Sequence, residues 1–253
     1  MAIEKTEQYL QHDPWDFLKQ YTAARIALGR TGVSIPLKES LNFKLAHANA
    51  RDAVFAALNH DALLPSLEAL HNEVICVQSQ AATRQMYLQR PDLGRKLDAQ
   101  DAEKVTASAS AGSHDVVFIV ADGLSSLAVN THSVPLLQLL IEECKKDRFS
   151  VAPIFLVQQG RVAISDEIGQ CVKARVAVIL IGERPGLTSP DSLGVYLTYN
   201  PKVGLTDESR NCVSNIRPQG LNYHDAARKI MWLIRESITR QLSGVHLKEP
   251  ALM

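Results

Sequence analysis

The chain lacks the features that would mark a membrane protein, a secreted protein or a nucleic-acid-binding protein. Its 253 residues contain no run of eighteen apolar residues, so no membrane span is expected. Residues 1–20 show no basic start followed by an apolar stretch, so no secretory signal is expected. Lysine plus arginine equals aspartate plus glutamate, at 27 each, which argues against a basic face that binds nucleic acid.

Cysteine is scarce, and the common catalytic motifs are missing. Cys76, Cys144, Cys171 and Cys212 form no C-x-x-C pair, which argues against a structural zinc site and for a reducing cytoplasm. No G-x-G-x-x-G follows a strand, and the chain has no Walker loop, no H-E-x-x-H and no G-x-S-x-G. The dinucleotide fingerprint and the familiar zinc-protease and hydrolase signatures are therefore excluded.

The second half of the chain alternates between strand patterns and amphipathic helix patterns. The segment 116–122 (VVFIVAD) is a near-continuous apolar run, typical of a parallel strand buried on both faces. Such alternation predicts an α/β fold with a doubly wound parallel sheet over residues 111–253. The other expected strands are 152–158, 176–182 and 194–199, and the expected helices are 134–146, 165–173 and 223–242, with Ser165 and Asn222 as N-caps.

The first 110 residues predict a mostly helical region. Asp13 as N-cap, Pro14 at the first helical position and Gly29 as the stop delimit a first helix. The other expected elements are a helix over 40–58, a helical piece over 61–70 interrupted by Pro65, a strand over 73–79, a helix over 84–97 that breaks before Pro91, and a helix over 98–110 that ends at Gly112.

One acidic residue stands where the strand 176–182 ends. Glu183 follows Gly182 and precedes a Pro-Gly turn, so its carboxylate lies at the carboxyl end of a buried strand, where open α/β sheets bind ligands. A carboxylate in such a place needs hydrogen-bond donors or solvent. The residues leave two interpretations open, namely acceptance of hydrogen bonds from ligand amides and a salt bridge with Arg184.

A second polar loop follows the strand 152–158, which we expect to neighbour the strand that ends at Gly182. Gly160 permits close approach of a bulky ligand, Arg161 offers a rigid set of donors, and the backbone near Val162 offers amide contacts. The alternative is a plain loop with a solvated arginine. Two such strand ends predict a wide binding surface rather than a small catalytic slot.

Three further polar stretches complete the candidates. Asp122-Gly123 ends the first long strand at the same edge of the sheet, and Asp92 is expected to cap a helix. The segment 210–220 (RNCVSNIRPQG) has little apolar periodicity and predicts an ordered loop. Within it, Cys212 is either a buried small hydrophobe or a residue that packs against a ligand. A catalytic thiolate is disfavoured because no histidine is near in sequence.

Together these stretches resemble the small (light) subunit of ethanolamine ammonia-lyase over about residues 20–240. The combination of GERPGL with NCVSNI is specific, whereas either alone would be weak. The matching segments are 23–32 (AARIALGRTG), 87–97 (YLQRPDLGRKL), 117–126 (VFIVADGLSS), 159–169 (QGRVAISDEIG), 180–187 (LIGERPGL) and 211–220 (NCVSNIRPQG).

The resemblance implies an enzyme that converts ethanolamine to acetaldehyde and ammonia with adenosylcobalamin. In that family the large subunit, a TIM barrel, carries the substrate site, and the small subunit supplies a Rossmann-like surface that covers the corrinoid. Carried over by motif, the cobalamin contacts fall on Val162, Glu183 and Cys212, with Arg161 and Gly182 as nearby candidates. The cofactor keeps its own base as cobalt ligand, and the chain has no D-x-H-x-x-G, so the resemblance implies no metal ligand and no catalytic residue here.

The resemblance also implies partners and a location. Residues 1–110 would contact the large subunit and residues 111–253 the cobalamin, within a higher hetero-oligomer in the cytoplasm. Some members carry a longer N-terminal extension linked to packaging in a bacterial microcompartment; here residues 1–12 precede the first expected helix, so packaging stays open. Two other interpretations remain: a Rossmann-like assembly or binding module without cofactor contact, and a stand-alone hydrolase whose triad meets only in the fold.

Overall fold

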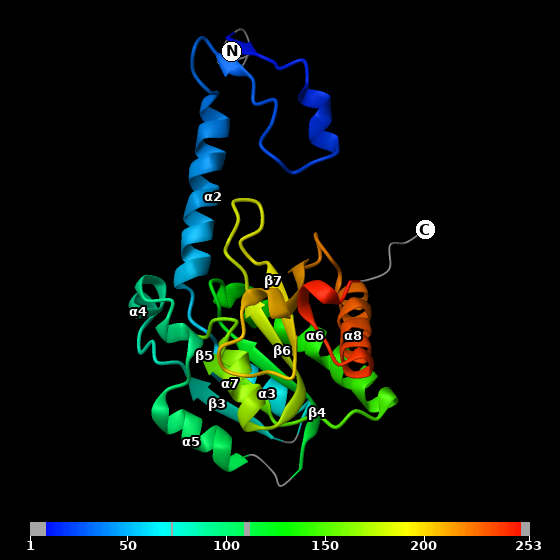
Figure 1. The fold of residues 1–253 in the computed structure, drawn as a ribbon. Coiled ribbons are helices and arrows are strands. Elements are labelled where there is room, and N and C mark those ends of the chain that lie inside the picture. Colours follow the sequence, from blue (N-terminus) through cyan, green and yellow to red (C-terminus); the bar gives the residue numbers. More distant parts are fainter. Residues whose placement is uncertain (1–8, 72, 109–111, 249–253) are drawn as a thin grey trace.

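Six strands form the main sheet, in the spatial order β3-β5-β4-β6-β7-β8 (Figure 1). The computed structural model describes residues 9–71, 73–108 and 112–248. The fold is α/β, as the alternation of strand and helix patterns predicts. The strands are β3 (Val74–Gln78), β4 (His114–Ala121), β5 (Ile154–Gln158), β6 (Ala174–Gly182), β7 (Leu193–Tyr199) and β8 (Arg210–Ile216).

The sheet is mixed, so the prediction of an all-parallel sheet is wrong in part. β3, β5, β4 and β6 run parallel, whereas β7 is antiparallel to β6 and β8 is antiparallel to β7. The connection over 183–192 is too short for the helical crossover that a parallel partner needs. The prediction of a loop over 210–220 is also wrong in part, because the first residues of that segment form β8. As an edge strand, β8 has exposed positions that carry polar residues and hide the strand pattern.

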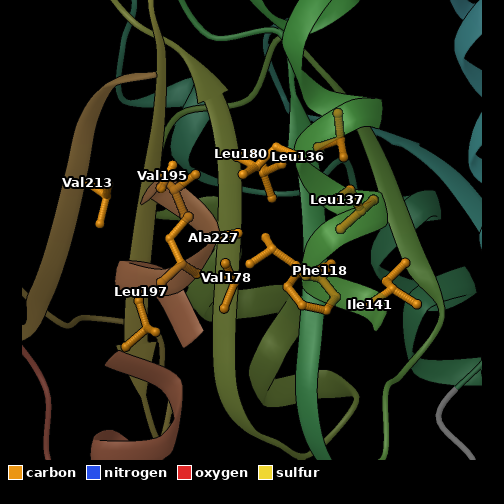
Figure 2. Close-up of a cluster of buried hydrophobic side chains, with 14 of the residues drawn as sticks. Phe118, Leu136, Leu137, Ile141, Val178, Leu180, Val195, Leu197, Val213 and Ala227 are labelled. Carbon is orange, nitrogen blue, oxygen red and sulfur yellow. The ribbon is translucent and has the colours of Figure 1, made fainter. Parts of the chain in front are cut away.

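Helices cover both faces of the sheet and create two cores. β4 shows the reason, because Phe118 belongs to one core while its neighbours Val117 and Ile119 belong to the other. Both faces of this strand are therefore apolar, which explains its continuous apolar run. Figure 2 shows the first core, where side chains of two helices meet the sheet. The helices are α3 (His60–Glu68), α6 (Ser126–Asp147) and α8 (Tyr223–Arg240) on that face, and α5 (Ala99–Ser108) and α7 (Ile164–Cys171) on the opposite face.

The helix starts agree with the sequence in part. α8 begins after Asn222, whose side chain caps it as predicted by accepting a backbone hydrogen bond of 3.0 Å. α6 begins at Ser126, well before the expected residue 134, because the helix accommodates Pro135 within its length. Ser165 is not the cap of α7, since it lies inside the first turn and its hydroxyl donates to a preceding carbonyl at 2.8 Å.

The region around Pro91 follows the prediction more closely. α4 (Arg84–Gln89) ends before this proline, and a 3₁₀ turn, Leu93–Arg95, comes after it. Asp92 makes no capping bond, so that prediction is wrong, and its carboxylate instead pairs with Arg90 at 2.7 Å. α5 matches the helix expected from residue 98, whereas that helix's last expected residues and the boundary expected after residue 110 lie outside the described residues.

Residues 9–55 form an arm that stands away from the sheet (Figure 1). Its longest element is α2 (Leu37–Phe55), close to the helix expected over 40–58, and Ala53 is the buried residue of that helix. A helix of this length gains most of its stability from packing against the rest of the protein. Because Ala53 is its one buried residue, α2 receives little such packing from the described residues. In the described residues, no helix combines the length and apolar character that crossing a bilayer requires.

The first helix expected between Pro14 and Gly29 is wrong. That segment contains one short 3₁₀ turn, Asp16–Gln20, before an irregular stretch. Trp15, Phe17 and Tyr21 of this segment are at least 55% exposed, so they lack the packing that stabilises an amphipathic helix. Two short strands, β1 (Leu10–Gln11) and β2 (Arg30–Thr31), pair and close the segment into a loop.

Candidate functional site

A cleft of about 470 Å³ opens at the carboxyl ends of β4, β5 and β6. This is the edge at which ligands bind in open α/β sheets. Loops that follow the three strands supply most of its walls, and β7 and α4 supply one tyrosine each. The lining residues are Tyr87, Gly123, Leu124, Arg161, Val162, Ile181, Gly182, Glu183, Arg184 and Tyr196.

The strands that precede Val162 and Glu183 are not neighbours, because β4 lies between β5 and β6. The expectation that they are adjacent is wrong, and the cleft is three strands wide. Two glycines allow its floor to close. A Cβ at Gly123 would lie 2.3 Å from the carbonyl oxygen of Gly182, and the amide of Leu124 donates to that same oxygen at 2.9 Å. The absence of side chains at these two positions therefore lets the ends of β4 and β6 pack backbone against backbone, which closes the floor of the cleft.

Asp122 joins the ends of β4 and β5 beneath the cleft. Its buried carboxylate accepts hydrogen bonds from the amides of Gln159 at 2.9 Å and Gly160 at 3.0 Å, and the Arg84 guanidinium lies 3.7 Å away. Burial raises the pKa of Asp122 to about 6. Because this side chain fills the space between the two strand ends, it shapes the edge of the sheet and leaves the cleft beside it for a ligand.

Glu183 extends from the end of β6 into the cleft wall. Its Oε2 accepts hydrogen bonds from the Ser192 hydroxyl and from the Asn215 amide, the latter at 3.2 Å. In the part of the chain that the structure describes, no ion pair joins it to Arg184, so the salt-bridge interpretation is wrong. Oε1 receives no hydrogen bond from a described residue and is free to accept one from a ligand.

Val162 and Arg161 form the wall on the β5 side. Val162 is half-buried and packs against the second core. The Arg161 guanidinium lies 4.1 Å from the centre of the Tyr87 ring and donates to the Tyr87 carbonyl at 3.2 Å. Arg161 is therefore held in place, unlike the solvated arginine of the alternative interpretation.

Cys212 adjoins the cleft through Tyr196. The two residues are register partners across β7 and β8. Cys212 is an exposed residue of the edge strand, so it is not the buried small hydrophobe of one interpretation. Partial desolvation of its sulfur still raises the pKa of the thiol, so the thiol stays neutral at pH 7 and is a weak nucleophile. Val162 and Glu183 thus line one cleft, and Cys212 touches a residue that lines it.

A buried ion pair fixes the two sides of this region to each other. Asp166 in α7 accepts a hydrogen bond from Arg210 at the start of β8, and both side chains are 2% exposed. Arg210 also donates to the Thr206 carbonyl at 2.6 Å. Since α7 follows Val162 and β8 contains Cys212, the pair fixes the separation of two of the predicted contacts.

The sequence interpretation missed two aromatic residues of the cleft. Tyr87 lies within the segment YLQRPDLGRKL and Tyr196 within the strand pattern GVYLTY, but neither pattern shows that its tyrosine faces a ligand site. Leu124 follows Asp122-Gly123, which the sequence does place at this edge, and it extends that stretch into the cleft.

Two other features lie outside this cleft. A hollow of about 540 Å³ opens at the opposite edge of the sheet, near Lys173 and Pro201, where the loops are less suited to ligand binding. The buried His132 hydrogen-bonds the Tyr223 hydroxyl at 2.6 Å and lies 3.4 Å from Asp191. Among the described residues, no serine or cysteine side chain hydrogen-bonds that imidazole, so it gives no support to a hydrolase. Within the described ranges, no three side chains of histidine, cysteine, aspartate or glutamate gather to hold a metal ion.

Comparison with known proteins identifies one family, which matches nearly the whole chain. The family model for the ethanolamine ammonia-lyase light chain (EutC) matches residues 12–248. The ethanolamine ammonia-lyase small subunit of Pseudomonas fluorescens (strain Pf0-1) is 55% identical over 241 residues, which cover 94% of this chain and 88% of the relative. The protein of the same name from Ralstonia nicotianae is 52% identical over 250 residues, covering 98% of this chain and 93% of the relative.

Proposed function

The chain belongs to the ethanolamine ammonia-lyase light-chain family, and we propose that it covers adenosylcobalamin at the interface with a large catalytic subunit. As a member of that family it is the small subunit of a carbon–nitrogen lyase. In our proposal the assembled enzyme converts ethanolamine to acetaldehyde and ammonia. The large subunit, a TIM barrel, binds the substrate, so this chain is inactive alone.

The observation that supports this proposal is that Val162 and Glu183 line one cleft, and that Cys212 is the register partner of Tyr196, which also lines it. The corrin ring is broad and is fringed with amide groups. A wide cleft with a backbone floor suits its size, and the free Oε1 of Glu183 suits its amide N–H donors. The residues present therefore fit the cofactor. We propose these three residues as the cobalamin contacts, with Arg161 and Gly182 beside them.

In this role the chain binds and shields rather than reacts. When bound, adenosylcobalamin supplies the radical that starts the reaction. The side chains of Val162 and Leu124 form an apolar wall that excludes water from the ring. Glu183 orients the ring by accepting a hydrogen bond at Oε1. The neutral thiol of Cys212 packs against the ring and takes part in no proton transfer.

The arm supports the proposal of a large partner. Along α2, Leu37, Leu41, Leu45 and Phe55 recur on one helix face, and each is at least 54% exposed. Apolar stripes of this extent mark interaction surfaces. We propose that residues 1–110 contact the large subunit, chiefly through this stripe, and that the Rossmann-like part over 111–253 contacts cobalamin. The assembly would be a higher hetero-oligomer.

The four free cysteines agree with a reducing compartment, and we propose a cytoplasmic enzyme. In some relatives of this kind the enzyme is packaged in a bacterial microcompartment, and our proposal for the cleft does not depend on that packaging.

Reconstitution tests the function. The chain and the large subunit, expressed separately, are mixed with adenosylcobalamin, and acetaldehyde release from ethanolamine is measured. We expect activity only when both chains are present. Activity of this chain alone, or full activity of the large subunit without it, would contradict the proposal.

A double variant tests the arm. Leu41→Glu combined with Leu45→Glu places two charges on the stripe and is expected to weaken assembly at least tenfold in pull-down titrations. Glu39→Lys changes the charge on the opposite side of α2 and serves as the matched control. If both variants assemble like the wild type, the stripe is not the contact surface.

A further inference from the structure

Arg161 carries a charge that no acidic side chain of the described residues balances. It is half-buried and lines the cleft, yet none of the ion pairs in the described ranges includes it. The other partly or fully buried arginines of the sheet region each have a carboxylate close by. These are Arg84 with Asp122, Arg210 with Asp166, Arg217 with Asp191, and Arg235 with Glu143 and Asp147.

The position of Arg161 is built into the fold. Its backbone amide donates to the Gly94 carbonyl at 2.7 Å, and a Cβ at Gly94 would lie only 2.8 Å from Cγ of Arg161. The guanidinium packs over the Tyr87 ring, and its Nε is buried without a hydrogen-bond partner. A flexible surface arginine would turn this donor to water, so the side chain is held in place at a cost.

A second cation increases that cost. The Arg84 guanidinium also lies over the Tyr87 ring, at 4.8 Å from its centre. Arg84 has the Asp122 carboxylate at 3.7 Å, whereas Arg161 has no such partner. Two positive charges beside one ring and one negative charge leave a net positive site at the cleft. A positive charge that is partly withdrawn from water and fixed in place favours an anion there.

We propose that Arg161 is the anion subsite of the cleft and binds the phosphodiester that links the nucleotide base of cobalamin to its corrin ring. This inference rests on the proposed function. The amide groups of the cofactor are neutral, and the phosphodiester is its anionic group. A planar guanidinium binds phosphate oxygens through two parallel hydrogen bonds, which lysine cannot do.

The proposed roles of the two subunits also determine how the cofactor is oriented between them. The adenosyl group must face the substrate on the large subunit. In the proposed function this chain would cover the opposite side of the corrin, where the nucleotide base and its phosphodiester would lie. The phosphodiester would then lie on the same side as Arg161.

Binding of three inactive corrinoids to the assembled two-subunit enzyme tests the inference. The probes are cyanocobalamin, cyanocobinamide phosphate, which keeps the phosphate but lacks the base, and cyanocobinamide, which lacks both. We expect Arg161→Gln to weaken the first two at least tenfold and to leave cyanocobinamide within twofold of the wild type. Arg161→Lys should lie between, because it keeps the charge but loses the paired donors.

Two controls separate the possible outcomes. Arg95→Gln removes the same charge from an exposed position next to Gly94 and should change no affinity more than twofold. Val162→Asp should weaken all three probes, because it places a charge where the corrin would pack.

An equal effect of Arg161→Gln on all three probes, or no effect, would overturn the anion subsite while Val162→Asp still supports the proposed function. The anion subsite would also be overturned if Arg161→Gln weakened assembly of the two subunits in the absence of corrinoid. In that case the anion bound by Arg161 would be a carboxylate of the large subunit. If Val162→Asp changes none of the affinities, the proposed function itself fails.

Discussion

Replacing Glu183 by glutamine changes the polarity of the cleft wall while keeping its shape. In the wild type, Oε2 is occupied by the Ser192 hydroxyl and the Asn215 amide, and Oε1 is free. Glutamine must turn its carbonyl oxygen toward these two donors to keep them satisfied. Its amide nitrogen then takes the place of Oε1 and presents a donor to the ligand, so a cofactor amide would meet a donor instead of an acceptor.

The expected loss follows from the bond that disappears. A hydrogen bond to a charged group contributes about 1.5–3 kcal/mol, which corresponds to roughly 10- to 100-fold in affinity. Glu183 is half-buried at the rim, where solvent screens its charge, so the lower end applies. We therefore expect Glu183→Gln to weaken cobalamin binding about tenfold.

Titration of the assembled enzyme with cyanocobalamin measures this affinity without turnover. Ser192→Ala is the matched control, because it removes one donor to Oε2 but leaves the carboxylate and its free oxygen in place. We expect that control to weaken binding less than threefold. An affinity of Glu183→Gln within twofold of the wild type would refute the assignment of Oε1 as a ligand acceptor.

Three further predictions concern the support of the cleft. Arg210→Met leaves the buried carboxylate of Asp166 unpaired, so we expect urea denaturation to show a loss of about 3–5 kcal/mol in the free energy of unfolding; a loss below about 1 kcal/mol would contradict this. Burial raises the pKa of Asp122 from its usual 3.8 to about 6, so the folded state binds that proton more tightly than the unfolded chain does. The free energy of unfolding of the wild type relative to Asp122→Asn should therefore fall by up to about 3 kcal/mol from pH 4 to pH 7, and a rise would contradict the sign. Cys212→Ala should keep kcat of the reconstituted enzyme within about threefold, since its thiol is neutral and makes only a packing contact; loss of all activity would indicate a nucleophile.

The parts of the fold that the sequence predicted are those in which local pattern and burial agree. β4 is apolar on both faces because helices cover both, and its continuous apolar run shows this directly. The segment before Gly29 has a helical pattern as well, but its large apolar residues Trp15, Phe17 and Tyr21 are exposed instead of packed. The direction of β7 depended on the length of the preceding loop rather than on its own residues.

The candidate site was predictable in its polar residues and less so in its aromatic ones. Glu183 and Arg161 stand out because each follows an apolar strand, and both line the cleft. Tyr196 could not be predicted, because the side of the sheet that a strand residue faces depends on pairing register. The absence of a carboxylate beside Arg161 is likewise a property of the fold, since Asp166, the nearest aspartate after it in the sequence, is paired with Arg210.

The most direct test of the central claim is a structure of the two-subunit enzyme with a bound corrinoid. Our account predicts that the ring lies over the cleft at the carboxyl ends of β4, β5 and β6, with Val162, Glu183 and Cys212 within contact distance. A ring bound elsewhere on the complex, with these three residues facing water or the other subunit alone, would contradict it.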